Sequence, residues 1–157
     1  MRPQGDEEEM KRAKDGRKVM MGKITMNTHS GSENRLQLFD GKFTSGWRVV
    51  EFRIIPKSPQ NQEEVMAVIS TEAPGAVPST FDFTDVQNIA YAAWNVPNQV
   101  AFADWNLVVE ENMAVEDLWV SCYTTGDDDY LNYYLVLEKY NFEAWDGAGI
   151  MARNNGQ

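Results

Sequence analysis

The stretch "LWVSCYTTGDDDYLNYYLVLEKY", residues 118–140, decides the fold class that this sequence predicts. Apolar side chains recur at every second position in residues 118–123 and again in residues 130–140, which is the period of a β-strand with one buried face. The glycine and the aspartates between the two runs are typical of a tight turn. We therefore predict two antiparallel strands joined as a hairpin, the second of them a central strand of its sheet.

Short apolar or alternating runs, separated by turn residues, continue toward the N-terminus. Residues 35–39 and 46–56 flank Asp40, Gly41 and Lys42, which predict a second hairpin. Further strands are expected at residues 63–71, 81–83, 89–94 and 101–109. Because no helical crossover separates these runs, about seven or eight strands predict an all-β fold, an antiparallel two-sheet β-sandwich that is jelly-roll-like.

The chain has 157 residues, enough for one domain with additional arms. We predict a charged N-terminal arm at residues 1–34, a β-sandwich domain at residues 35–140, and a C-terminal tail, helical or irregular, at residues 141–157. Bases outnumber acids in residues 1–23, but the remainder is acidic and the whole chain carries a net charge of −10. Such a body repels phosphate groups, so no nucleic-acid partner is expected.

Residues for nucleophilic or zinc chemistry are scarce. His29 is the only histidine and Cys122 the only cysteine, and Cys122 alternates with apolar residues as a buried thiol would. No Ser/His/Asp, Cys/His or zinc-binding set can be assembled from them. Nucleophilic and zinc chemistry are therefore excluded and no cofactor is expected, while a small hydrolase that uses a pair of carboxylates stays open because acids are plentiful. No apolar run reaches the length of a membrane span, so no membrane partner is expected, and we expect the protein to be made in a cytosol.

The consecutive carboxylates Asp127, Asp128 and Asp129 are the candidate metal ligands of the sequence. They do not match an EF-hand loop, because Asn132 stands where that loop requires glycine. Two interpretations remain, a loose cation site at the tip of the hairpin and a solvent-exposed turn that binds no metal. The second needs fewer assumptions, so the sequence predicts no metal site.

Aromatic residues are the other candidates for function. Trp119 and Tyr123 share a face of one predicted strand, and Tyr134 lies on the strand predicted to pair with it. Aromatic side chains are enriched at protein interfaces, although sugar-binding sandwiches also stack sugar rings on exposed aromatics. The predicted interface residues, which include apolar residues of the tail, are Trp119, Tyr123, Tyr134, Phe142, Trp145, Ile150 and Met151.

Three stretches, "RLQLFDGKFTSGWRVVEFRI" (35–54), "MAVEDLWVSCYTTGDDDYLNYYLVLEKY" (113–140) and "WDGAGIMARNNGQ" (145–157), resemble small structural proteins of tailed or marine bacteriophage particles, of the capsid decoration or minor capsid type. The resemblance implies a virion protein with a β-sandwich on the capsid, in it or at the neck, and it assigns no functional residues. We expect a homo-oligomeric, non-enzymatic protein that binds capsid protein or neighbouring subunits through its arms and aromatic faces. The alternative is a carbohydrate- or receptor-binding β-sandwich module that uses exposed Trp and Tyr.

Overall fold

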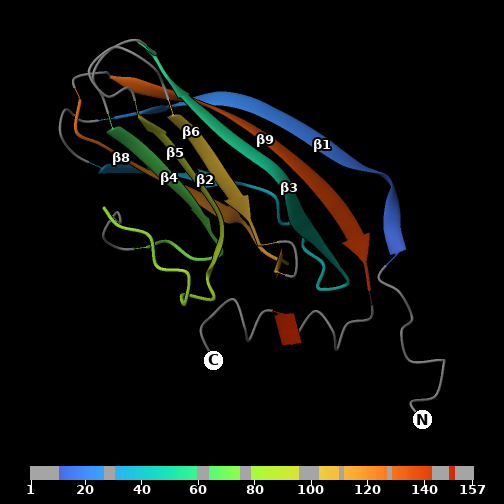
Figure 1. Ribbon diagram of the computed structural model, residues 1–157. Coiled ribbons are helices and arrows are strands. Elements are labelled where there is room, and N and C mark those ends of the chain that lie inside the picture. Colours follow the sequence, from blue (N-terminus) through green and yellow to red (C-terminus); the bar gives the residue numbers. More distant parts are fainter. Residues whose placement is uncertain are drawn as a thin grey trace.

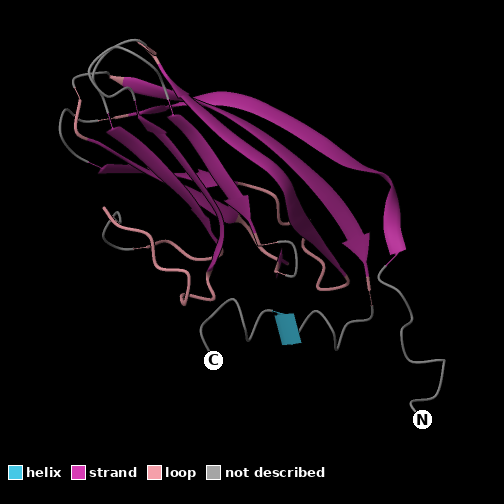
Figure 2. Cartoon of the chain, viewed as in Figure 1, coloured by secondary structure: helices cyan, strands magenta, loops and turns pink. Residues whose placement is uncertain are grey.

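The computed structural model describes residues 11–26, 31–59, 64–74, 79–95, 103–109, 112–126, 129–142 and 149–150. Their regular elements are almost all β-strands, which form two antiparallel sheets packed face to face (Figures 1 and 2). Sheet A contains, in spatial order, β1 (Lys11–Thr25), β9 (Tyr130–Asn141), β3 (Ser45–Pro56) and β7 (Met113–Ala114). Sheet B contains, in spatial order, β2 (Gly31–Leu36), β8 (Leu118–Thr124), β4 (Glu64–Ser70), β5 (Asn88–Asn95) and β6 (Ala103–Val108).

The strand orders are those of a jelly roll with one added strand. If the edge strand β6 is set aside, the two sheets interleave as two Greek keys, because the chain passes from one sheet to the other at nearly every connection. The prediction of an all-β, antiparallel two-sheet sandwich is therefore confirmed. The described residues contain nine strands, slightly more than expected, and one of these, β7, pairs with β3 at only two positions.

The core lies between the sheets and is built from the inward-facing side chains of both. Leu118, Val120 and Cys122 of β8 are buried there, and Leu135 and Leu137 of β9 reach the same cluster from the other sheet. The predicted burial of the cysteine thiol is confirmed. The period-two pattern that indicates these strands thus results from burial against the opposite sheet.

Both predicted hairpins are wrong. β8 pairs with β2 and β4 in sheet B, whereas β9 pairs with β1 and β3 in sheet A, so residues 124–129 connect one sheet to the other. The same holds at Gly41, because β2 and β3 also belong to different sheets. Turn residues predict that the chain reverses, but the next strand can then join either the same sheet or the facing one. In a jelly roll it usually joins the facing sheet.

The predicted N-terminal arm is largely β-structure. Lys11–Thr25 forms β1, which pairs along β9, and Gly31–Leu36 forms β2 at one edge of sheet B. Ile24 of β1 is buried in the core, but the outward positions Val19 and Met21 are apolar too, so its sequence lacks the apolar alternation of a half-buried strand. Residues 1–10 and most of the predicted tail, residues 143–148 and 151–157, lie outside the described residues.

The connection between β4 and β5 differs from the prediction in one element. Residues 81–83 were predicted as a short strand, but they pair with no strand. The chain turns after them, and the Asn88 amide donates a hydrogen bond, 3.1 Å long, to the Asp85 carbonyl. The strand predicted from Ile89 is confirmed as β5.

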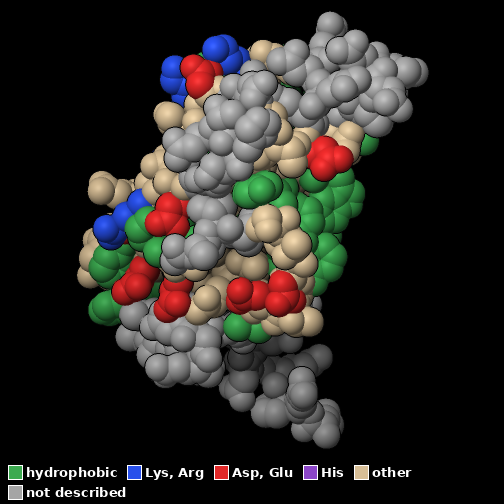
Figure 3. Space-filling model, turned by 90° about the vertical axis from the view of Figure 1, so that its left-hand side faces the viewer, with side chains coloured by type: hydrophobic (Ala, Val, Ile, Leu, Met, Phe, Trp, Pro, Cys, Tyr) green, Lys and Arg blue, Asp and Glu red, His purple; other side chains and the backbone are tan. Residues whose placement is uncertain are grey.

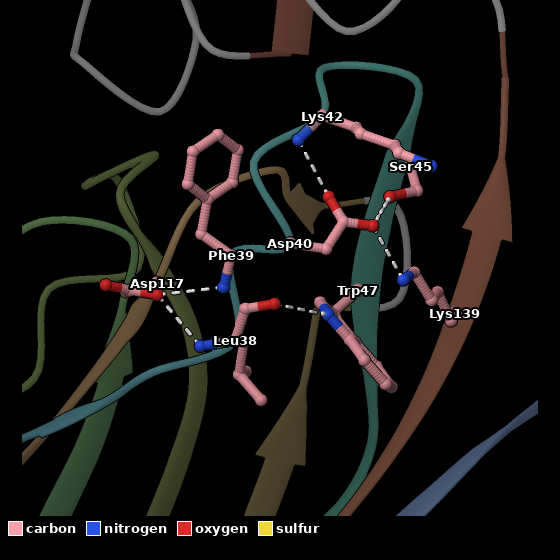
Figure 4. A network of polar contacts seen from close by, with 8 residues as sticks. All are labelled: Leu38, Phe39, Asp40, Lys42, Ser45, Trp47, Asp117 and Lys139. Carbon is pink, nitrogen blue, oxygen red and sulfur yellow. Dashed lines mark hydrogen bonds and ion pairs between the residues drawn. The ribbon is translucent and has the colours of Figure 1, made fainter.

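A carboxylate from the far end of the sequence holds the connection from β2 to β3 (Figure 4). Asp117 accepts hydrogen bonds from the backbone amides of Leu38 and Phe39, 2.8 and 2.9 Å long. It also accepts one from the Arg35 side chain at 2.7 Å. Burial raises the pKa of Asp117, but these hydrogen bonds outweigh burial and lower it. The indole nitrogen of Trp47 donates to the Leu38 carbonyl at 3.2 Å, so both backbone groups of Leu38 have partners.

A second carboxylate, Asp40, closes the same connection. It accepts hydrogen bonds from the Lys42 amide at 2.9 Å, the Ser45 hydroxyl at 2.7 Å and the Lys139 ammonium group of β9 at 2.8 Å (Figure 4). Burial raises the pKa of Asp40, but these bonds and the Lys139 charge outweigh burial and lower it to about 2. Gly41 beside it has a φ of 83°, which side chains disfavour. The glycine therefore permits the turn that the two carboxylates hold.

The edge strand β6 carries polar side chains toward the core side of its sheet. Asp104 lies opposite Trp94 and Asn106 opposite Ala92, and paired residues of antiparallel strands project to the same side. Trp94 and Ala92 belong to the core, yet Asp104 and Asn106 are exposed. The inner side of β6 therefore extends beyond the covered part of the core.

We expect adjacent isoleucines of β3 to differ sharply in their effect on stability. Ile54 is 1% exposed and Ile55 is 47% exposed. Ile54→Ala should lower the free energy of unfolding by about 2–5 kcal/mol, because it leaves a cavity between the sheets. Ile55→Ala should cost less than about 1 kcal/mol. Urea denaturation of both variants checks this, and equal losses would contradict the assignment of the two faces.

Asp40 should make stability depend on pH in the acidic range. Its pKa is lowered from 3.8 to about 2, so its contribution is complete above pH 4 and is lost as the pH falls through about 2. At pH 7 we expect Asp40→Asn to cost at most about 2 kcal/mol. Urea denaturation at pH 7 and pH 2 should show the difference between wild type and variant shrinking, and a constant difference would argue against the Lys139 contact.

Candidate binding surface

The outer face of sheet B, which points away from the core, is rich in aromatic side chains. Trp119 and Tyr123 of β8 project to this face, as the sequence predicts, because their neighbours along the strand point into the core. Strand pairing places Tyr91 of β5 on the same face, and Trp105 and Leu107 of β6 continue it to the sheet edge. Side chains of four aromatic residues therefore lie on one surface of this sheet.

The loop before β5 folds back on this face. Asp82 accepts hydrogen bonds from the Thr84 amide at 2.9 Å and the Thr84 hydroxyl at 2.6 Å, and Asp85 accepts one from the Gln87 amide at 3.0 Å. These contacts close two successive turns through the loop. The Tyr91 hydroxyl then donates to the Asp82 carbonyl at 2.8 Å, which ties the loop to the sheet.

Two phenylalanines of this loop join the sheet aromatics in one cluster. The ring of Phe83 lies edge-on to Tyr91, with centroids 4.8 Å apart, and nearly parallel to Trp105, with centroids 6.1 Å apart. Phe81 contacts Tyr91 and Trp105 as well, each with centroids 5.4 Å apart. We call the cluster the aromatic patch, and it consists of Phe81, Phe83, Val86, Tyr91, Trp105 and Leu107.

Much of the aromatic patch is in contact with solvent. Phe83 is 62% exposed and Trp105 40% exposed, while Tyr91 beneath them is buried. Large apolar side chains grouped in this way on a surface usually mark a binding site. Figure 3 shows hydrophobic side chains next to acidic ones on the side of the molecule where β8 lies.

The patch is negatively charged at its rim. The Thr84 hydrogen bonds lower the pKa of Asp82, which keeps this carboxyl ionised. Burial raises the pKa of Tyr91, and the charges of Asp85 and Asp82 raise it further. An apolar partner surface with positive charge would complement this surface.

The residues predicted to form one interface lie in several places. Trp119, on the aromatic face, lies under the Arg35 guanidinium with 5.8 Å between the charge and the ring centroid, and Tyr123 lies two positions further along β8. Tyr134 is on the opposite side of the molecule, because β9 belongs to sheet A. Phe142 and Ile150 are half-buried beyond β9, whereas residues 145 and 151 lie outside the described part.

Of the three aspartates predicted as the weak metal candidates, the structure describes Asp129, and this residue shows no sign of a cation site. The Asp129 carboxylate forms an ion pair with Lys57 at 2.9 Å, and this contact lowers its pKa. Asp127 and Asp128 lie outside the described residues, as does His29. Among the residues that are described, no three His, Cys, Asp or Glu side chains are grouped so that they could hold a metal ion. No helix in that part of the chain is long and apolar enough to cross a membrane.

Comparisons with known proteins give no further assignment. No protein-family model matches this sequence, and a search of curated proteins finds no match.

The aromatic patch was not predicted as a site, although its signal is present in the sequence. Phe81 and Phe83 alternate because both rings pack on Tyr91 and Trp105, and this alternation suggested a strand instead. Trp105 lies in the strand expected at residues 101–109, and nothing in that stretch alone marks it as part of a site. The pairing of β5 with β6 brings these residues together, and that pairing depends on contacts outside the local sequence.

The Tyr91 hydroxyl should anchor the loop that carries Phe83. We expect Tyr91→Phe to lower the free energy of unfolding by about 0.5–1.5 kcal/mol, the usual contribution of one hydrogen bond. Amide hydrogen exchange should also accelerate at Thr84 and Gln87. Tyr134→Phe, on the other sheet, serves as the matched control and should leave exchange in this loop unchanged. Equal exchange in wild type and Tyr91→Phe would mean that the hydroxyl does not hold the loop.

Proposed function

We propose that the protein is a non-enzymatic structural component of a bacteriophage particle, which binds capsid protein or a neighbouring subunit through the aromatic patch. The observation that carries this proposal is the exposure of Phe83 and Trp105 together on a folded loop and an edge strand. Aromatic residues are the side chains that most often dominate the energy of protein interfaces. The phage context rests on the resemblance of the sequence stretches quoted above.

The composition of the patch favours a protein partner. Phe83, Val86 and Leu107 offer apolar surface without hydrogen-bonding groups. The two carboxylates beside them, Asp82 and Asp85, already accept hydrogen bonds from their own loop. A sugar site needs several polar groups free to bind hydroxyls, whereas an apolar protein surface needs only the rings and a polar rim.

The fold agrees with this proposal by analogy alone. Jelly rolls occur in viral capsid proteins and also in lectins, so the architecture is compatible with both functions under consideration. The second candidate, a carbohydrate- or receptor-binding module, is favoured by one specific observation. The rings of Phe83 and Trp105 lie within 27° of parallel, which provides a flat stacking surface.

Binding to particles tests the proposal. We expect the purified protein to co-sediment with particles of the phage that carries its gene, which contain both capsid protein and copies of this chain. Replacing both exposed aromatics, Phe83→Ser with Trp105→Ser, should weaken this binding by about tenfold or more, because interface aromatics commonly contribute 2 kcal/mol or more each. Phe43→Ser is the matched control, since the exposure of Phe43 lies between those of Trp105 and Phe83 but Phe43 belongs to the β2–β3 connection.

Two outcomes would contradict the proposal. If wild type and double variant bind particles equally, the aromatic patch is not the docking surface. If the wild type binds a glycan array and no particle, and the double variant loses the glycan signal, the carbohydrate-binding alternative is correct. Circular dichroism of each variant, with melting curves, should show that the sandwich remains folded.

A further inference from the structure

The outer face of sheet A differs chemically from that of sheet B. On β1, Arg17, Val19, Met21 and Lys23 alternate with inward residues and project outward. Met21 is 78% exposed and Val19 49% exposed, so this strand presents apolar side chains to solvent between two bases. A strand that has uncovered apolar groups on its outer side offers a surface to a partner.

Strand pairing extends this surface across the sheet. Met21 of β1 lies opposite Tyr134 of β9, which lies opposite Arg53 of β3, so the three side chains form one row. The neighbouring row contains Lys23 and, two strands away, the exposed Ile55. We call this surface the basic face, and it consists of Arg17, Val19, Met21, Lys23, Arg53, Ile55 and Tyr134.

The charges of the two outer faces are opposite in sign. On the basic face, Arg53 is paired with Glu51 at 2.7 Å, and Arg17 lies opposite Glu138 of β9, which is itself paired with Arg48 of β3. Four bases of these strands, Arg17, Lys23, Arg48 and Arg53, thus share this side with two carboxylates, so its described strand positions keep a net positive charge. The aromatic patch on the other sheet has Asp82 and Asp85 at its rim. Each face also has exposed apolar side chains, so the two are complementary in charge and in hydrophobicity.

We propose that the partner of the aromatic patch is a second copy of this chain, which docks through its basic face. This inference rests on the proposed function, because it names the occupant of the surface assigned there. Met21 and Val19 of one copy cover Phe83 and Trp105 of the next. The bases of the first copy meet the carboxylates of the second.

The contact joins two different surfaces, and this determines the kind of assembly. The two faces belong to opposite layers of the sandwich (Figure 1), so a copy that uses its basic face still has a free aromatic patch. Such a heterologous contact adds copies in one direction, and it produces either a closed ring or an open row of subunits. A symmetric dimer is not the expected product.

Sedimentation velocity on the purified full chain tests this inference with two double variants. The patch variant carries Phe83→Ser and Trp105→Ser, and the face variant carries Met21→Ser and Lys23→Glu. Wild type should form species larger than a dimer as its concentration rises, and added salt should weaken the association because screening reduces the charge attraction. Each variant alone should associate at least about tenfold more weakly, whereas their equimolar mixture should form a 1:1 dimer and nothing larger.

The mixture makes the experiment decisive. The patch variant keeps an intact basic face and the face variant keeps an intact aromatic patch, so only one productive contact remains between them. A mixture that stays monomeric overturns the inference, as does a face variant that associates like wild type. Phe43→Ser should behave as wild type, and circular dichroism of both double variants should show that the loss does not come from unfolding.

Failure of this inference can be separated from failure of the proposed function. If wild type stays monomeric at every concentration and salt level but still co-sediments with particles through its patch, the occupant is another virion protein and the self-association is overturned. If wild type assembles as described but binds no particle, the self-association stands and the phage assignment is overturned.

Discussion

Two carboxylates, Asp40 and Asp117, hold the connection by which the chain leaves sheet B and enters sheet A. The connection has to satisfy its own backbone groups, because no strand runs beside it. Asp117 supplies acceptors to two consecutive amides, and Asp40 binds the lysine of β9, beside which β3 must pair. The crossing therefore ties the start of β3 to β9, its neighbour in sheet A.

This order leaves both outer faces of the sandwich without covering helices in the described residues. Each face then takes its character from the outward positions of its strands and from the loop that folds onto it. On sheet B these positions are aromatic, and the loop from Phe81 to Gln87 adds two more rings and two carboxylates. On sheet A they combine bases with Val19 and Met21. The same alternation that builds one core thus produces two unlike surfaces.

The sequence predicts what depends on local burial and misses what depends on distant partners. Strands β8 and β9, which contain Leu118 and Leu135, are predicted correctly because each of them buries every second side chain. The pairing of those strands was misassigned, since β8 finds its neighbours in β2 and β4, far away along the chain. β1 was missed as a strand because its exposed side carries the apolar residues Val19 and Met21, which hide the alternation that burial of Ile24 produces. For the candidate site, Trp119 and Tyr123 were placed on the correct outer face, but the patch requires the pairing of β5 with β6.

The polar side chains on the inner side of β6 affect how the protein aggregates when many copies are close together. An exposed strand edge can recruit strands from other molecules and start fibril growth. Asp104 and Asn106 point to the side where a stacked sheet would have to pack, so a strand added beside β6 would bury a carboxylate without a partner. A protein with this edge can be present at high local concentration and still associate through side-chain surfaces, which form and separate reversibly, instead of through its backbone.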